Sequence, residues 1–305
     1  MKKVWNFENL SEDEPVTPAD PDAEPELDES LRNPKVGLAI DAVRGALTDL
    51  VRNHGVTKDD VTVAVGALVD MSVEDPVFTR HHLVSILAQA WDPAGGWDVA
   101  TQGTPADSEG PVYYPDAPLV DNPGVLPMRE DEAGVPLIVS GQVRSLAGEP
   151  LAGAELDVWL ATASGHYSNT GVRGLPDFVL RGRLLTDDKG RYEYRAIKPV
   201  PYDFPVRPKT ADYMLLAQGF SRYRPRHIHV KVRHPDLSGE FTTQLYFRGD
   251  PYLRYYPATP AQRSLASLLQ LDVELHDDPR EITDRGLSRP FETSQFDLVL
   301  KTKRR

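Results

Sequence analysis

Cysteine is absent from the 305 residues of the chain. Its absence excludes disulfides, iron–sulfur clusters and thiolate-bound haem, so His, Tyr, Asp and Glu remain as ligands for any metal. Positive charge is outnumbered: 34 Lys and Arg side chains stand against 46 Asp and Glu, so the formal net charge is −12 and the isoelectric point is near 5.1. This acidity argues against nucleic acid or an anionic membrane surface as the main partner.

Long apolar runs are missing as well. No stretch approaches the ~20 residues that a membrane-spanning helix needs. The first residues, Met1 to Glu8, lack the apolar segment of a secretory signal. We therefore expect a cytoplasmic protein without membrane insertion.

Three regions differ in composition. Residues 1–33 are acidic and rich in proline, which predicts a flexible tail, because such a segment cannot bury enough apolar surface to offset its ordering entropy. Residues 34–100 carry apolar side chains at helical spacing, which predicts helices over about 34–51 and 76–91. Between them, Thr57 and Asp60 have the spacing of a capping box and predict the start of a third helix. We expect a small N-terminal helical module that serves as a dimerisation or linker domain.

Residues 101–305 lose the helical period, and Pro and Gly recur every few residues. Short alternating runs, separated by turn signals, predict six strands: Leu137–Val143, Ala154–Leu160, Arg191–Ile197, His227–Val232, Phe241–Phe247 and Phe296–Leu300. This pattern is typical of an antiparallel β-sandwich. The sequence therefore predicts a mainly β protein with a helical attachment.

The strand that begins at His227 carries a candidate metal site. Side chains two residues apart share one face of a strand, about 7 Å apart along it, so His227 and His229 can converge on one ion. A lone His-X-His pair is more often structural, and two imidazoles do not complete a site. Tyr167 and Tyr202 each lie just past a predicted strand, although either one alone would be read as a packing residue.

The combination of these residues with several other blocks is more specific. The blocks are Glu109–Tyr114, Gly141–Val143, Val158–Trp159, Gly165–Tyr167, Thr186–Tyr192, Ile197–Tyr202, Arg224–His229 and Thr242–Tyr252. In this order they resemble the intradiol ring-cleaving dioxygenases, a non-haem iron(III) family that includes catechol and hydroxyquinol 1,2-dioxygenases. The resemblance covers about residues 108–257 densely and the helical module loosely.

The resemblance implies a set of roles. Fe(III) would be bound by four ligands: Tyr167, Tyr202, His227 and His229. Tyr202 would also leave the metal and accept a proton from the substrate, while Arg224 and Gln244 would stabilise charge on the substrate ring. Arg226 departs from the family's usual small residue, and strand alternation directs its side chain away from the histidine face.

The resemblance also implies that both atoms of O₂ enter an ortho-diphenol, giving a ring-opened muconate or maleylacetate-type dicarboxylate. Substrate contacts are expected from Tyr113, Asp116, Phe204 and Arg224. Asp116 could meet an extra ring hydroxyl, which slightly favours hydroxyquinol over catechol, or it could cap a turn. A homodimer with phospholipid bound between the helices is a further implication.

Two other classes stay open on the residues alone. A non-catalytic β-sandwich binding module would explain the strands and the acidity. An Fe(II) cupin-type extradiol dioxygenase also carries His-X-His on a strand, but it adds a Glu four or five residues later, where this chain has Arg233 and His234.

Overall fold

The computed structural model describes residues 45–46, 48–49, 51–74, 98–107, 109–130, 132–203, 221, 223–255 and 265–303. The expected tail, most of the expected helix over 34–51, the expected helix over 76–91 and Phe204 lie outside these residues. No helix within the described ranges combines the length and the apolar character that crossing a membrane requires.

The helix predicted to begin at Thr57 is confirmed as α2, Lys58–Glu74. The backbone N–H and the hydroxyl of Thr57 donate to Asp60 Oδ2 at 2.9 and 2.6 Å, and the Asp60 N–H donates to Thr57 Oγ1 at 3.2 Å. This reciprocal pair is the capping box that the spacing predicted, because it satisfies backbone donors that the first helical turn leaves free.

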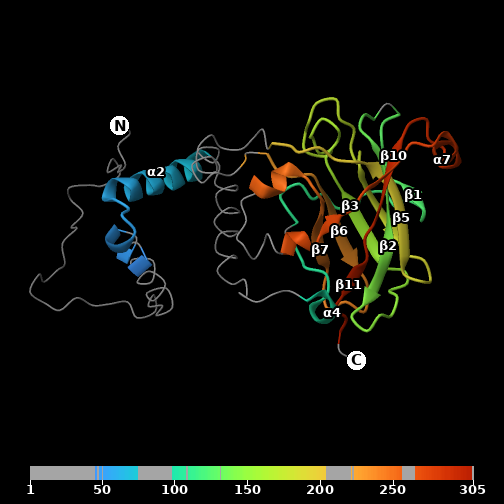
Figure 1. The fold of residues 1–305 in the computed structure, drawn as a ribbon, viewed down its shortest axis with the longest axis horizontal. Helices are drawn as coiled ribbons and strands as arrows, with labels where there is room; N and C mark the ends of the chain where they lie inside the picture. The colour runs from blue at the N-terminus through green and yellow to red at the C-terminus, as the bar shows by residue number, and fades with distance from the viewer. Residues whose placement is uncertain are drawn as a thin grey trace, which may run out of the picture. The chain divides into compact units, whose positions relative to one another are not determined.

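The rest of the described chain is mainly β, as the sequence predicted (Figure 1). One sheet contains β1 (Gly124–Val125), β5 (Arg191–Ile197), β2 (Pro136–Ser145), β10 (Phe291–Gln295) and β9 (Glu274–His276), with β11 (Leu298–Leu300) also paired to β2. The other sheet runs β4 (Arg181–Leu185), β3 (Glu155–Trp159), β6 (His227–Arg233), β7 (Phe241–Phe247) and β8 (Gln270–Leu271). Short helices α4 (Val99–Gln102), η2 (Pro251–Tyr255) and α7 (Pro279–Asp284) lie in the connections.

The sheets are mixed, which corrects the expectation of purely antiparallel pairing. The central pairs β2–β5, β3–β4, β3–β6 and β6–β7 are antiparallel. However, β1–β5, β10–β2, β11–β2 and β7–β8 are parallel. Alternation along one strand predicts its two faces, but it carries no information on the direction of a neighbour that arrives from far along the chain.

One hydrophobic core draws on both sheets. It contains Val139 and Tyr194 from the first sheet and Val158 and Val230 from the second, all at most 1% exposed. Strand β6 is buried almost throughout. Its even-numbered residues enter this core, so its odd-numbered residues, beginning with His227, occupy the opposite face.

Gly141 in β2 sits where a side chain cannot fit. A Cβ atom there would lie 1.9 Å from the carbonyl oxygen of Phe296 and 2.9 Å from the Tyr192 hydroxyl, which donates to that same oxygen at 2.6 Å. The backbone that links β10 to β11 therefore passes directly over Gly141, and even one added methyl group must displace it.

We expect Gly141→Ala to lower the free energy of unfolding by roughly 1–3 kcal/mol, because the backbone contact must open. Gly239→Ala is the matched control, since nothing lies within 4 Å of a Cβ at that exposed position. Urea denaturation of both variants measures the difference. Equal midpoints would contradict the close contact at Gly141.

Candidate metal centre

Four side chains that the sequence predicted as a set come together in the structure. The His227 Nε2 atom lies 3.1 Å from His229 Nε2, 3.3 Å from the Tyr167 hydroxyl and 3.4 Å from the Tyr202 hydroxyl. All four residues are at most 5% exposed. Two phenol oxygens and two imidazole nitrogens therefore share one small buried space.

Two of the four residues lie on a strand, and the other two lie in segments that follow strands. His227 and His229 lie on the same face of β6. Tyr167 lies in the loop after β3, and Tyr202 follows β5 and forms an isolated antiparallel bridge with Arg224. Gly165 allows this approach, since its φ of +82° suits glycine and a Cβ there would lie 2.9 Å from Tyr202 Cβ.

This arrangement fits a metal ion. Adjacent ligands of a first-row metal, each about 2.0–2.1 Å from it, are about 3 Å apart, close to the spacing around His227 Nε2. Among the described residues no group of three His, Asp or Glu side chains could hold a metal. A site here consequently needs the phenol oxygens. Iron(III), a hard ion, accepts such a set of oxygen and imidazole donors.

The electrostatics of the site suit the binding of a metal ion. Burial lowers the pKa of His227 and His229 well below its ordinary value, and the positive charge of Arg224 acts in the same direction. Both imidazoles are therefore neutral at neutral pH, which is the form that binds a metal. Burial raises the pKa of the Tyr167 hydroxyl well above its ordinary value, and the charges of Arg224 and Arg181 oppose this rise.

Arg224 and Gln244 also lie at this site. The Arg224 guanidinium donates to Gln244 Oε1 at 2.8 Å and to the Tyr202 hydroxyl at 3.4 Å. Gln244 lies opposite His229 in the β6–β7 pairing, so strand register places its side chain beside the imidazole. A cation and an amide dipole are thus fixed next to Tyr202.

Arg181 is a neighbour of the site that sequence reasoning missed. It is 1% exposed, and its guanidinium lies 5.7 Å from the centre of the Tyr167 ring. Its Nε and Nη2 atoms donate to the hydroxyl and carbonyl oxygens of Ser168 at 3.0 and 2.8 Å. Strand β4, which carries Arg181, was itself missed, because the run Arg181-Gly182-Arg183 breaks the alternation of apolar and polar residues.

Trp159 belongs to the sequence block Val158–Trp159, but that block does not predict its contact with the site. Its ring stacks on the His229 imidazole with centroids 4.7 Å apart and planes 5° apart. Cross-strand register makes Trp159 the partner of both His229 and Arg181. Register between distant strands cannot be read from a sequence, so no local signal could have identified this contact.

The residues expected to bind substrate differ in their burial and in their contacts with the site. Arg224 is half-buried beside Tyr202, as described above. Tyr113 packs against a buried cluster that includes Tyr167 and Tyr202, but its hydroxyl is bonded to Asp157 and Arg233. Asp116 is exposed and has a φ of +63°, in the left-handed region that aspartate tolerates. Arg226 pairs with Asp250 at 3.3 Å, which agrees with a side chain directed away from the histidines.

Comparison with known proteins gives these features a context. Residues 108–302 match the family model described as Dioxygenase. This match identifies the class of protein as a dioxygenase. The chain is 32% identical to chlorocatechol 1,2-dioxygenase of Rhodococcus opacus over 227 residues, 73% of this chain and 85% of that protein. It is 31% identical to catechol 1,2-dioxygenase of Acinetobacter baylyi over 282 residues, 90% of this chain and 88% of that protein. The chain belongs to the intradiol ring-cleaving dioxygenase family.

A solved structure also resembles the fold. Hydroxyquinol 1,2-dioxygenase from Pseudomonas putida superposes with a TM-score of 0.71 at 24% identity, covering 90% of this chain and 94% of that one. At this identity the likeness concerns the fold alone. Family membership makes the protein an intradiol dioxygenase.

Proposed function

We propose that Tyr167, Tyr202, His227 and His229 bind one iron(III) ion at which the protein cleaves an ortho-diphenol between its two hydroxyl-bearing carbons. The single observation that carries the proposal is that the other three donor atoms lie 3.1–3.4 Å from His227 Nε2. Bound iron(III) would supply a centre that holds both diol oxygens and makes the ring reactive towards O₂.

The residues around the ion then have distinct tasks. As a phenolate, Tyr202 can accept a proton from the diol. Arg224 donates to the Tyr202 oxygen and to Gln244, so its charge lies where negative charge would develop on the substrate. A catechol plus O₂ gives a muconic acid with no other reactant, because both oxygen atoms enter the product.

The substrate class follows from the relatives and from Asp116. The relatives more than 30% identical act, by their names, on catechol or chlorocatechol. Asp116 offers a carboxylate that could bind the third hydroxyl of hydroxyquinol. We therefore propose a catechol-type ortho-diphenol as substrate, with hydroxyquinol as the alternative that Asp116 favours.

We also propose the organisation expected from the sequence: a tail over 1–33, a helical domain over 34–100 and a catalytic β-domain over 101–305, in a cytoplasmic homodimer. The support for the dimer is a set of exposed apolar side chains on α2, namely Val63, Val65, Val69 and Val73. Phospholipid bound between the helices rests on the family resemblance alone.

Removing a ligand tests the metal proposal. We expect Tyr167→Phe and His229→Ala each to lose most of the bound iron, the visible phenolate-to-iron band and turnover. Tyr192→Phe is the control, since its hydroxyl bonds to Phe296 O instead. Elemental analysis and absorbance measure the result, and chelation of the iron should abolish activity. Full iron content in either ligand variant would be incompatible with the assignment.

Removing the charge of Arg224 tests its separate role. We expect Arg224→Met to keep its iron but to lower kcat by about 10²–10³, the usual loss when a stabilising donor is removed. Arg248→Met is the matched control, because Arg248 is 58% exposed and pairs with Asp272 at the surface. Initial rates of O₂ uptake compare the two variants. Unchanged turnover in Arg224→Met would show that Arg224 does not stabilise charge on the substrate.

A substrate panel tests Asp116. O₂ uptake is measured with catechol, chlorocatechols, hydroxyquinol and protocatechuate. If Asp116 binds a third hydroxyl, Asp116→Asn should lower kcat/KM for hydroxyquinol relative to catechol by about tenfold, because a charged hydrogen bond is weakened. The exposed Asp121→Asn should leave the ratio unchanged. If Asp116→Asn leaves the ratio of kcat/KM for hydroxyquinol to that for catechol unchanged, Asp116 does not bind the third hydroxyl and only caps a turn.

A further inference from the structure

The two histidines at the site are supported in different ways. The Nδ1 atom of His227 lies 2.7 Å from the Pro225 carbonyl oxygen, the contact that usually fixes the ring of a metal-binding histidine. The Nδ1 atom of His229 is buried and has no hydrogen-bond partner in the part of the chain that the structure describes. Within the described part of the chain, the His229 ring therefore lacks the Nδ1 hydrogen bond that His227 has.

Trp159 supports that ring by stacking against it. The two rings stack almost in parallel. The indole Nε1 atom of Trp159 is itself buried without a hydrogen-bond partner among the described residues. Among the described residues, the position of Trp159 consequently depends on packing, and a second aromatic neighbour there is Tyr113, with ring centroids 4.9 Å apart.

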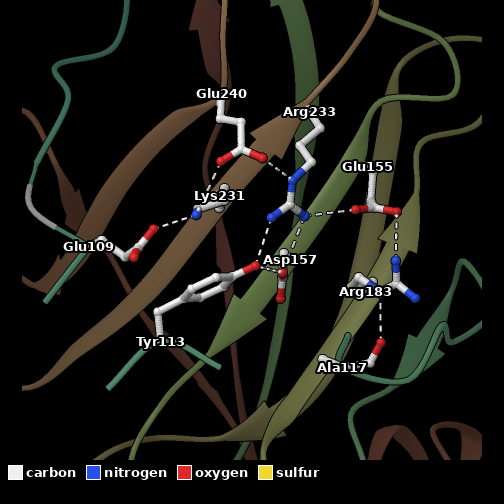
Figure 2. A network of polar contacts seen from close by, with 9 residues as sticks. All are labelled: Glu109, Tyr113, Ala117, Glu155, Asp157, Arg183, Lys231, Arg233 and Glu240. Carbon is white, nitrogen blue, oxygen red and sulfur yellow. Dashed lines mark hydrogen bonds and ion pairs between the residues drawn. The ribbon is translucent and has the colours of Figure 1, made fainter. Parts of the chain in front are cut away.

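Tyr113, unlike Trp159, is fixed by polar contacts. Its hydroxyl donates to Asp157 Oδ2 at 2.9 Å and accepts from Arg233 Nη2 at 2.7 Å. The Lys231 ammonium lies 3.9 Å from the centre of its ring. Figure 2 shows the Tyr113 hydroxyl meeting Asp157 and Arg233, with Lys231 between Glu109 and Glu240.

The other contacts of this network hold its members in place. The Arg233 guanidinium also donates to Glu155 at 2.9 Å and to Glu240 at 2.6 Å. Lys231 forms an ion pair with Glu109. The next residue, Gly110, runs so close to the site that a Cβ would lie 3.4 Å from His229 Cε1. Residues 109–113 are thus attached to β6 at the level of His229.

We propose that Tyr113 is a positioning residue: held by Asp157 and Arg233, it fixes Trp159, and Trp159 in turn orients the His229 imidazole by stacking. The inference rests on the proposed metal site, since it concerns a ligand of that site. It also replaces the expected role of Tyr113 as a substrate contact, because both hydrogen-bonding directions of its hydroxyl are already used.

The test uses the full-length, iron-loaded protein and the variant Tyr113→Phe, which keeps the ring and removes only the hydroxyl. We expect the dissociation constant for iron, measured by competition with a chelator, to rise about tenfold, as when an outer partner of a metal ligand is lost. The KM for catechol should change less than twofold. The electron paramagnetic resonance signal of iron(III) should change in rhombicity, since one ligand is less well oriented.

Two further variants make the test specific. Trp159→Phe interrupts the chain of contacts one step nearer to His229, so it should weaken iron binding at least as much. The double variant Tyr113→Phe/Trp159→Phe should lose no more iron affinity than Trp159→Phe alone, because both changes act through one contact. Tyr192→Phe, which loses a buried hydroxyl bonded to Phe296 O, should leave iron affinity unchanged.

The outcomes separate this inference from the proposed function. Wild-type protein that binds no iron would remove the metal site and the inference together. If the wild type binds iron normally, three results overturn the inference alone: a raised KM with unchanged iron affinity in Tyr113→Phe, strictly additive losses in the double variant, or an equal loss in Tyr192→Phe.

Discussion

The structure depends on the two faces of strand β6. Its even-numbered residues Ile228, Val230 and Val232 lie in the core between the sheets. Its odd-numbered residues carry the titratable side chains, first His227 and His229 and then Lys231 and Arg233. Because the side-chain period of a strand is two, a shift of register by one residue would exchange these faces and bury the charges in the apolar core. The packing that stabilises the fold therefore also fixes the site.

Charge is the second constraint on this site. The imidazoles and phenols are buried, and a buried charge needs a partner of opposite sign. Arg181 is almost fully buried, and its hydrogen bonds in the described part of the chain go to the oxygen atoms of Ser168, not to a carboxylate. Its charge acts on Tyr167, as does that of Arg224. Two cations beside two phenols suit a site in which the phenols become anionic.

The sequence predicted the parts of this arrangement that depend on local pattern. The capping box at Thr57, the strand from His227 and the convergence of His227 with His229 all follow from spacing. The pairing of those histidines with Tyr167 and Tyr202 needed the family resemblance, because the four residues are far apart along the chain. Strand direction, and the strands β1, β4, β8, β9 and β10, were missed. The contacts of Trp159 and Arg181 depend on register between strands, which no local pattern encodes.

The polar network around Tyr113 is better explained by positioning than by stability. Glu109 and Glu240 are 41% and 55% exposed, and ion pairs with such groups contribute little, about 0–1 kcal/mol each. Lys231 and Asp157, in contrast, are at most 5% exposed, so each would be costly to bury without its partners. Apolar residues could cover this face of β6 at least as stably. Unlike them, directional hydrogen bonds restrict Tyr113 to one orientation, and that restriction passes through Trp159 to His229, whose Nδ1 atom has no hydrogen-bond partner among the described residues.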